Sequence, residues 1–233
     1  MVSLAGRERL VGCTRYCTHP ASSLDGVTRI GGTKNPELEK ILGLAPDLVL
    51  GNAEENREED LQWLAQRVPV LVQTPCTVAQ SADCLRELGE ALGASERAES
   101  IAGRLSAAAQ SSPVASPVRV LYLIWCKPWM SINHTTYIHD VLRLTGASNV
   151  CAGRQDRYPV IDVPEVVAAG VDLVLLPDEP WVFDEAQAQD LAARGCFGAA
   201  RVMRCSGRDF CWHGVHATVG LERARALLEP ARA

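Results

Sequence analysis

One structural unit occurs twice in this chain, and it restricts the fold more than any other feature. Residues 35–44 form a short helical stretch that leads into the apolar run Ala45-Pro-Asp-Leu-Val-Leu50, and residues 163–169 lead in the same way into Gly170-Val-Asp-Leu-Val-Leu-Leu-Pro177. Strands that are apolar on both faces are typical of parallel sheets covered by helices. The repeat therefore predicts two α/β halves.

Each half continues in the same order after its repeat. A polar loop, a second helix and a second strand follow at 52–57, 58–66 and 68–73 in the first half, and at 178–183, 184–193 and 201–205 in the second. Alternating β and α elements indicate parallel sheets in both halves. Ligands of such sheets bind beyond the carboxyl ends of the strands, so we expect binding residues in the loops at 52–56 and 178–183.

A helical segment separates the two halves. Thr77-Val-Ala-Gln80 is a capping-box pattern that opens one helix, Gly93 ends it, and Ser95 opens another. Residues 111–117, rich in Ser and Pro, break the second helix. We predict an N-terminal α/β lobe at 1–76, a helical connector at 77–116 and a C-terminal α/β lobe at 117–233.

Composition indicates which binding partners and which cellular location to expect. The chain has 233 residues, 47% of them hydrophobic, with scattered Lys and Arg and a net charge of −5, so we do not expect nucleic acid as a partner. No apolar run approaches the roughly 20 residues that span a bilayer, and charges follow the N-terminus too soon for a secretory signal. Nine cysteines, an odd number, favour a reducing compartment. As written, the sequence predicts a cytoplasmic monomer.

The first cluster of metal-ligand residue types lies near the N-terminus. Cys13, Cys17 and His19 read C-x₃-C-x-H. Structural zinc sites have tighter paired spacings and four ligands, and no second pair follows here. We therefore favour an apolar Cys13 and a loop Cys17 over a metal site.

The second such cluster lies near the C-terminus and contains Cys205, Cys211, His213 and His216. The two histidines at i and i+3 could share one helical face, but the ligand pattern is incomplete. We favour solvated or capping histidines and predict no metal ligands in this chain.

Aromatic residues gather in the second half. Most of those in predicted loops lie after residue 120: Trp125, Trp129, Tyr137, Tyr158, Trp181, Phe183 and Trp212. Rings outside a core stripe offer a large rigid surface for a ligand. We expect Trp125 to end the strand 118–125 inside the core, and binding and packing stay equally open for Trp129, Trp181 and Trp212.

No catalytic motif is present. The sequence lacks G-x-S-x-G, a P-loop, G-x-G-x-x-G and H-E-x-x-H. The carboxylates at 54–60 stand at a predicted helix start, where the helix dipole favours them. We predict a protein that is not an enzyme.

The order of several motifs resembles a known family. In the first half they are Leu10-Val-Gly-Cys-Thr-Arg-Tyr-Cys-Thr-His-Pro20, Gly31-Gly-Thr-Lys-Asn-Pro36, Ala45-Pro-Asp-Leu-Val-Leu50 and Asn52-Ala-Glu-Glu-Asn56. In the second half they are Trp125-Cys-Lys-Pro-Trp-Met130, Thr136-Tyr137, Arg157-Tyr-Pro159, Asp172-Leu-Val-Leu-Leu-Pro177 and Glu179-Pro-Trp-Val-Phe183. From about Leu10 to Leu228 the chain resembles the class III solute-binding proteins, the helical-backbone metal receptors that include cobalamin- and siderophore-binding components of ABC importers.

The resemblance implies a fold, a ligand and a partner. It implies two α/β lobes with parallel sheets joined by a helical backbone, and a metal chelate, a corrinoid such as cobalamin or an iron complex, held in the interlobe cleft for ABC-type uptake. The chain would carry no cofactor of its own. By position, the ligand contacts would be Tyr16, Cys17, His19, Trp129, Arg157, Tyr158, Glu179, Trp181, Phe183 and Trp212. Glu58 and Glu185, at comparable helix starts, would dock onto the permease.

The chain also differs from this family in two respects. Family members begin with a further strand and helix, so we expect the first strand and helix of lobe 1 to be missing, with a sheet edge left unpaired. Importing members work outside the cytoplasm, unlike the location expected from composition. Two alternatives remain open at this point. One is a Cys/His metal- or cluster-dependent enzyme of chelatase or nitrogenase-like architecture, and the other is a degenerate intracellular sensor.

Overall fold

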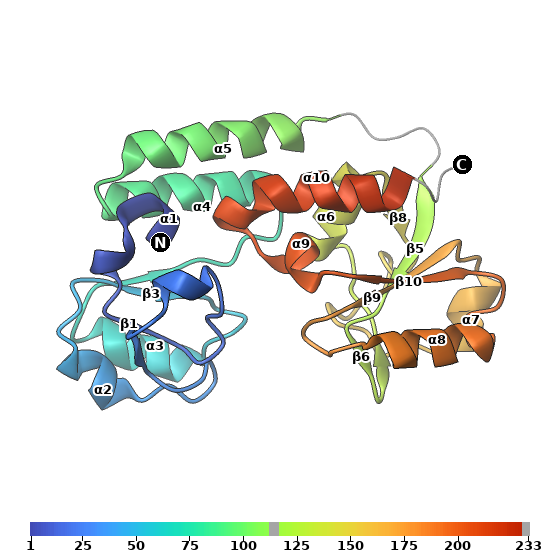
Figure 1. Cartoon of the computed structure of the whole chain (residues 1–233), viewed down its shortest axis with the longest axis horizontal. Coiled ribbons are helices and arrows are strands. Elements are labelled where there is room, and N and C mark those ends of the chain that lie inside the picture. The colour runs from blue at the N-terminus through green and yellow to red at the C-terminus, as the bar shows by residue number, and fades with distance from the viewer. Residues whose placement is uncertain (112–116, 230–233) are drawn as a thin grey trace. The chain divides into compact units, whose positions relative to one another are not determined.

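The computed structural model describes residues 1–111 and 117–229, which form two compact units (Figure 1). Unit 1 comprises Met1–Thr74 and Cys84–Ser100, and unit 2 comprises Pro75–Asp83 and the chain from Ile101 onward. Two long helices contribute residues to both units. The predicted helix break at 111–117 lies outside the described residues except for its two end residues.

Helices and strands alternate through most of the chain. The α-helices are α1 (Val2–Ala5), α2 (Leu38–Gly43), α3 (Glu58–Ala65), α4 (Val78–Ala91), α5 (Ser95–Ala109), α6 (Tyr137–Leu144), α7 (Val163–Ala168), α8 (Glu185–Ala193), α9 (Gly207–Cys211) and α10 (Ala217–Leu228). Short 3₁₀ helices in the described residues are η1 (Arg7–Arg9), η2 (Ala21–Ser23) and η3 (Gly214–His216). The strands are β1 (Gly12–Cys13), β2 (Thr28–Arg29), β3 (Val49–Gly51), β4 (Val70–Val72), β5 (Val118–Tyr122), β6 (Trp125–Cys126), β7 (Trp129–Met130), β8 (Ala147–Asn149), β9 (Leu173–Pro177) and β10 (Arg201–Cys205).

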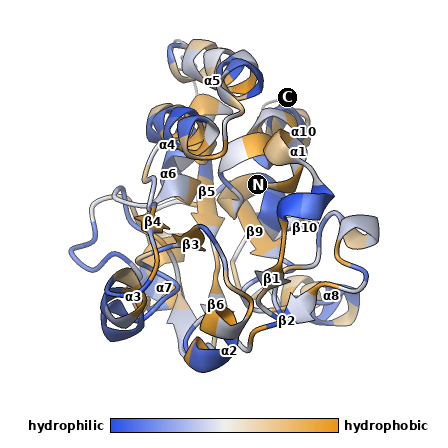
Figure 2. Ribbon diagram, turned by 90° about the vertical axis from the view of Figure 1, so that its left-hand side faces the viewer, coloured by the Kyte–Doolittle hydropathy of each residue, from blue (hydrophilic) through white to orange (hydrophobic). Residues whose placement is uncertain are grey.

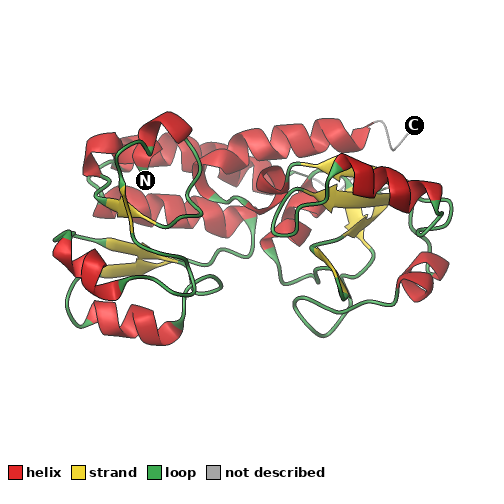
Figure 3. Cartoon of the chain, turned by 60° about the horizontal axis from the view of Figure 1, so that its bottom comes forward, coloured by secondary structure: helices red, strands yellow, loops and turns green. Residues whose placement is uncertain are grey.

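Unit 1 contains two short parallel strand pairs, β1 with β2 and β3 with β4 (Figure 3). The helix predicted at 35–44 begins later than expected. Pro36 forms a β-bridge with Gly31, so α2 begins only at Leu38. Helices α4 and α5 approach closely where Gly89 faces Ala98, since a Cβ on Gly89 would lie 2.3 Å from the Ala98 Cβ.

The predicted capping box at the start of α4 is confirmed in part. The Thr77 hydroxyl accepts a hydrogen bond from the Gln80 N–H at 3.1 Å. The Gln80 side chain accepts from the Cys76 N–H rather than from Thr77. One orphan donor of the helix start, the Gln80 N–H, is thereby satisfied.

Unit 2 is built on a four-stranded parallel sheet in the order β10-β9-β5-β8. The five residues of β9 are all buried, and β5 pairs with it through Val120–Leu173, Leu121–Val174 and Tyr122–Leu175. Figure 1 shows α6, α9 and α10 on one side of this sheet and α7 and α8 on the other. Figure 2 shows the hydrophobic colour on β5 and β9. An α/β fold with parallel sheets, as predicted, is confirmed.

The predicted strand at 118–125 is shorter than expected. Strand β5 ends at Tyr122, and Trp125 belongs to β6, which pairs antiparallel with β7 in a small hairpin. Within residues 1–111 and 117–229, no helix is both long enough and apolar enough to cross a bilayer.

Candidate functional site

In the four-stranded sheet of unit 2, the direction in which successive strands are added reverses at β5. From β5 the chain passes through α6 to β8 on one side, and then returns to β9 on the other side of β5. In open parallel sheets, ligands bind beyond the carboxyl ends of the two strands that flank such a reversal. The segments that leave these ends in unit 2 are the β6–β7 hairpin and the loop at 178–183.

Two tryptophans meet at this place, one from each segment. The ring centroids of Trp125 and Trp181 are 4.6 Å apart, at an interplanar angle of 70°. Trp125 is 38% exposed, so the prediction that it lies in the core is wrong. Its strand ends three residues earlier, and its indole N–H donates to the Lys127 carbonyl within the hairpin. The buried Trp181 indole N–H has no acceptor in the described part of the chain.

Two further aromatic residues lie in or against the core cluster on which Trp181 packs. The Trp129 and Phe183 rings are nearly parallel with centroids 6.4 Å apart, and Trp129 also contacts Phe197 edge-on. Phe183 is 0% exposed, and Trp129 and Trp181 pack against the same hydrophobic cluster. Phe183 thus lies behind the surface and presents no area to solvent.

Arg157 and Tyr158 lie beside the hairpin. Val160 forms a bridge with Met130, and the Ser131 N–H donates to the Pro159 carbonyl, which holds this segment against β7. The Arg157 guanidinium lies 5.7 Å from the centroid of the Tyr158 ring. An exposed phenol and a cation therefore lie next to the tryptophan-bearing hairpin.

Glu179 contacts a thiol rather than a cation. The Cys211 thiol donates to Glu179 Oε1 at 3.1 Å, and the Gly207 N–H donates to Asp178 Oδ1 at 2.7 Å. Burial, with the nearby carboxylates, raises the pKa of the Cys211 thiol well above its ordinary value and also raises that of Cys205. Both thiols are therefore held protonated, in which form they are poor nucleophiles.

Trp212 and the C-terminal histidines lie around α9 and η3. The Trp212 ring contacts His216 with centroids 5.9 Å apart, and the Arg208 guanidinium lies 5.6 Å from the Trp212 centroid. His216 Nε2 pairs with Asp209 Oδ1 at 2.9 Å, while His213 contacts the Tyr137 ring. Among the described residues, no three His, Cys, Asp or Glu side chains are grouped so as to hold a metal ion.

The predicted contacts in unit 1 share the loop after β1. Tyr16 is 57% exposed with the Arg15 guanidinium 5.1 Å from its ring centroid, and His19 Nδ1 is 3.0 Å from the Thr18 hydroxyl. Cys17 is half-buried and packs against the cluster around Cys13. The loop therefore presents a tyrosine and a histidine to solvent and keeps its thiol partly covered.

The two predicted docking glutamates have matching environments. Glu58 and Glu185 are the first residues of α3 and α8, and each is exposed. Each accepts a hydrogen bond from the glutamine four residues later, Gln62 at 2.9 Å and Gln189 at 3.0 Å. Glu185 also faces Arg204 at 3.6 Å.

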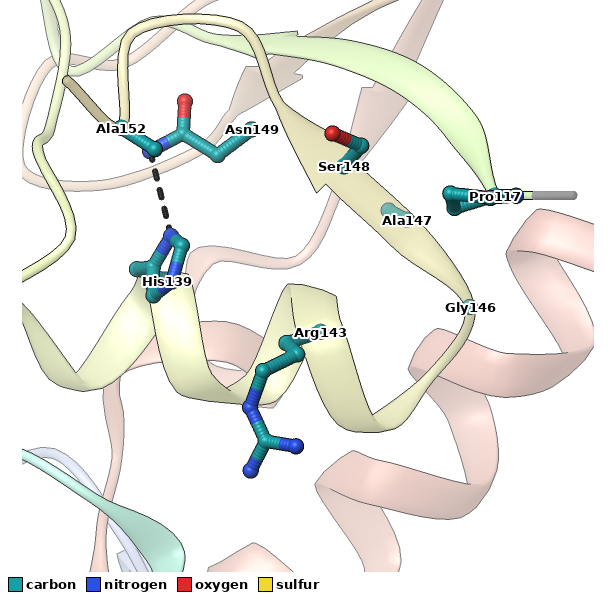
Figure 4. Close-up of a pocket in the computed structure, with 8 residues that line it drawn as sticks. All are labelled: Pro117, His139, Arg143, Gly146, Ala147, Ser148, Asn149 and Ala152. Atoms are coloured by element: carbon teal, nitrogen blue, oxygen red, sulfur yellow. Dashed lines mark hydrogen bonds between the residues drawn. The ribbon is translucent and has the colours of Figure 1, made fainter. Parts of the chain in front are cut away.

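A small cavity lies elsewhere in unit 2, between α6 and the edge strand β8 (Figure 4). Its volume is about 210 Å³, and it is lined by Pro117, His139, Arg143, Gly146, Ala147, Ser148, Asn149 and Ala152. Sites for drug-sized ligands begin at about 300 Å³. This cavity contains none of the predicted contact residues and is too small for a macrocycle.

The sequence matches the profile of a known family along most of its length. The profile of the periplasmic binding proteins covers residues 2–193. The chain belongs to this family. It is a broad family, and the match by itself names no solute.

Individual relatives show which members of this family the chain is similar to. The chain is 25% identical over 167 residues to the vitamin B12-binding protein of Vibrio parahaemolyticus, a match that covers 69% of this chain and 60% of that relative. The crystal structure of the periplasmic vitamin B12 binding protein BtuF of Vibrio cholerae superposes with a TM-score of 0.82 at 19% identity, over 99% of this chain and 92% of that one. The periplasmic haem-binding protein HutB of the same species gives 0.82 at 19%, over 98% and 94%.

These relatives bear on two earlier expectations. All three are binding proteins, and none of their names describes an enzyme, so the alternative of a metal- or cluster-dependent enzyme gains no support. The two solved structures are periplasmic proteins, and the expectation of a cytoplasmic location finds no support in them. At these identities the superpositions establish the fold alone.

Proposed function

We propose that this chain is the solute-binding component of an ABC-type importer and that its solute is a metal-bearing macrocycle, with a corrinoid as the first candidate. One observation carries the proposal: a partly exposed tryptophan pair lies at the switch point of the unit 2 sheet. Rings of this kind cover the flat face of a large ligand with little loss of conformational entropy. The vitamin B12-binding relatives provide independent support.

The contacts follow from this placement. Trp125 and Trp181 would cover the ligand face, and Tyr158 and Arg157 would add a polar edge. The core cluster that contains Phe183 would hold Trp181, together with Trp129, from behind. Tyr16, Cys17, His19, Glu179 and Trp212 stay predicted contacts.

Haem is the second candidate solute. Tyrosine and histidine are residue types that hold haem iron, and the exposed Tyr16, His19 and Tyr158 are of these types. Haem-binding proteins are also among the structural relatives. A corrinoid needs no such ligand from the protein when its cobalt already carries two axial groups, so the two candidates make different demands on these side chains.

The first experiment is a thermal-shift titration with cyanocobalamin, cobinamide, haem and a ferric siderophore. A ligand at one hundred times its Kd stabilises the fold by about 2.7 kcal/mol, which raises the Tm by several degrees. We expect a selective upward shift with the corrinoids. A cooperative melt that none of the four ligands moves would contradict the proposal.

Docking to the permease is tested separately from ligand binding. We propose that Glu58 and Glu185 contact basic residues of the permease, because both stand exposed at helix starts. Glu58→Lys and Glu185→Lys should weaken binding to the reconstituted permease and leave ligand affinity unchanged. Glu222→Lys, on the exposed side of α10, is the matched control and should alter neither. Equal effects of all three reversals would show that net charge, not these positions, governs docking.

The proposal also assigns a location. A solute-binding component of an importer meets its solute outside the cytoplasm, so we propose an extracytoplasmic site of action. Fractionation of cells that express the native gene, with a cytoplasmic marker enzyme as control, tests this. Recovery with the cytoplasmic marker would contradict it.

A further inference from the structure

Two cysteines of unit 1 lie in one small cluster at the end of β1. Cys13, the last residue of β1, is buried, and the half-buried Cys17 packs against its cluster. Cys17 also raises the pKa of the Cys13 thiol, an effect that requires the two side chains to be near one another. The Thr14 hydroxyl lies 3.5 Å from the Cys17 sulfur. The two thiols are therefore neighbours between which a disulfide can form.

The backbone between the two cysteines is already folded back on itself. The Cys17 N–H donates to the Thr14 carbonyl at 3.2 Å, which closes a turn. Arg29 Nη1 donates to both the Thr14 and the Cys17 carbonyl at 2.9 Å. The ends of the loop are thus held together without a covalent bond.

The same arginine faces the buried sulfur. Arg29 Nη1 lies 3.1 Å from Cys13 Sγ. Burial raises the pKa of the Cys13 thiol, and the Arg29 guanidinium opposes that effect. A cation at this distance stabilises the thiolate that disulfide exchange requires.

The accessibility of the two sulfurs sets the order of the steps. Cys17 is partly open to solvent and is flanked by exposed residues on both sides, whereas Cys13 is closed off. An external disulfide can therefore reach Cys17 first. Cys13 then lies in place to resolve the mixed disulfide.

We propose that Cys13 and Cys17 form a reversible disulfide by exchange with a low-molecular-weight disulfide of the glutathione type. Cys17 loses its proton to solvent, and its sulfur attacks glutathione disulfide, breaking the S–S bond and releasing one glutathione as thiolate. Cys13 then loses its proton, attacks the Cys17 sulfur and releases the second glutathione. Two cysteine thiols are oxidised, one glutathione disulfide is reduced to two thiols, and the two protons end on the released glutathiones.

The remaining cysteines include a built-in control. Cys205 and Cys211 in unit 2 also lie near one another, but burial and nearby carboxylates raise the pKa of both thiols, and the Arg204 guanidinium, which acts on Cys205, is the smallest effect there. Their thiols are held protonated and should not exchange under native conditions. Both pairs can be measured in one digest.

The experiment is peptide mapping of the native chain after equilibration in glutathione buffers of stepped redox ratio. Exchange is stopped with acid, and the free thiols are then alkylated in a denaturing buffer. The alkylated protein is digested with trypsin. Cleavage after Arg9, Arg15 and Arg29 separates Cys13 and Cys17 onto peptides 10–15 and 16–29, so a disulfide appears as a linked pair. The Cys205–Cys211 bond would link peptides 205–208 and 209–223 in the same way.

We expect the linked pair of peptides 10–15 and 16–29 to accumulate as the share of glutathione disulfide increases, and to disappear on return to reduced glutathione. Peptides 205–208 and 209–223 should remain unlinked at the same redox ratios. In Cys13→Ser, Cys17 should stop at the mixed disulfide with glutathione, and in Cys17→Ser, Cys13 should be recovered alkylated. Arg29→Lys keeps the trypsin site and should slow the exchange several-fold. Recovery of Cys13 and Cys17 as alkylated thiols across all ratios, or a Cys17 mixed disulfide that never resolves in the native chain, would overturn the proposal.

Discussion

The sheets of the two units differ in length, pairing and burial. Unit 2 has one four-stranded parallel sheet, and every residue of β9 is buried. Unit 1 has two separate two-stranded pairs, and neither β3 nor β4 contains a buried residue. A continuous sheet with a buried central strand fixes the segments that leave its strand ends. Unit 2 is therefore the part of the molecule that can hold a rigid aromatic surface.

Unit 1 positions its loops by hydrogen bonds from side chains instead. Arg29 clamps the loop after β1, and Asn52 accepts from the N–H groups of Glu54 and Glu55 in the loop after β3. Each such bond contributes about 1 kcal/mol, much less than the packing of a buried strand. The comparison indicates that unit 2 carries a rigid surface. In unit 1, single polar side chains hold the loops in place.

The largest expected effect compares the two sheets directly. Leu175 in β9 is 0% exposed, and Leu50 in β3 is 43% exposed. Leu175→Ala should lower the free energy of unfolding by about 2–5 kcal/mol, because it leaves a cavity in the core, whereas Leu50→Ala should cost under about 1 kcal/mol. Urea denaturation followed by circular dichroism measures both. Equal losses would remove the proposed difference between the units.

The next comparison uses two buried aspartates that pair with an arginine three residues away. Asp140 accepts from Arg143 at 2.7 Å and also from the Val78 N–H at 2.8 Å, whereas Asp60 accepts only from Arg57 among the hydrogen bonds of the described residues. Asp140→Ala should cost about 3 kcal/mol, since it leaves a buried N–H unpaired, and Asp60→Ala about 1–2 kcal/mol. The same denaturation assay applies. A larger loss for Asp60→Ala would contradict the expectation that the aspartate with the additional buried N–H partner contributes more.

A smaller effect depends on pH and belongs to unit 2. Burial lowers the pKa of His139 below its ordinary 6.5; His134 and Arg143 act in the same direction, and Asp140 acts against them. The folded state then binds the proton less readily than the unfolded state, so the contribution of His139 is complete above about pH 6.5 and is lost as the pH falls through its lowered pKa.

The check is the difference in urea midpoint between the native chain and His139→Gln, measured from about pH 7.5 to about pH 5. We expect the native chain to lose more stability over this range than the variant. A variant with the same slope as the native chain would show that His139 does not contribute to the acid sensitivity of unit 2.

The alternation of helices and strands could be predicted from the sequence because it depends on local patterns. The repeated apolar runs predicted β3 and β9, and the strand predicted at 201–205 is β10 with the same bounds. Helix α10 was missed because its buried positions include Ala217, Gly220 and Ala224, whose small side chains give a weak apolar stripe.

The candidate site was less predictable, because it depends on contacts between distant segments. The environment of Trp125 is set by where β5 stops and by the hairpin that follows, and its partner Trp181 is 56 positions further along the chain. Phe183 carries the same sequence signal as Trp181 but is fully buried, whereas Trp181 is partly exposed and Val182 between them is 65% exposed. Pattern alone does not decide which of two neighbouring rings is exposed.

The most direct test of the central claim is the affinity of the preferred macrocycle for tryptophan variants, measured by isothermal titration calorimetry. The double variant Trp125→Ala/Trp181→Ala removes the surface at the switch point, and Trp63→Ala, on α3 of unit 1 beneath Arg67, is the matched control. We predict at least about a tenfold loss of affinity in the double variant, since each aromatic contact contributes about 1 kcal/mol or more, and no change in Trp63→Ala. An unchanged Kd in a folded double variant would contradict the account, because the ligand would then be held without the surface on which it rests.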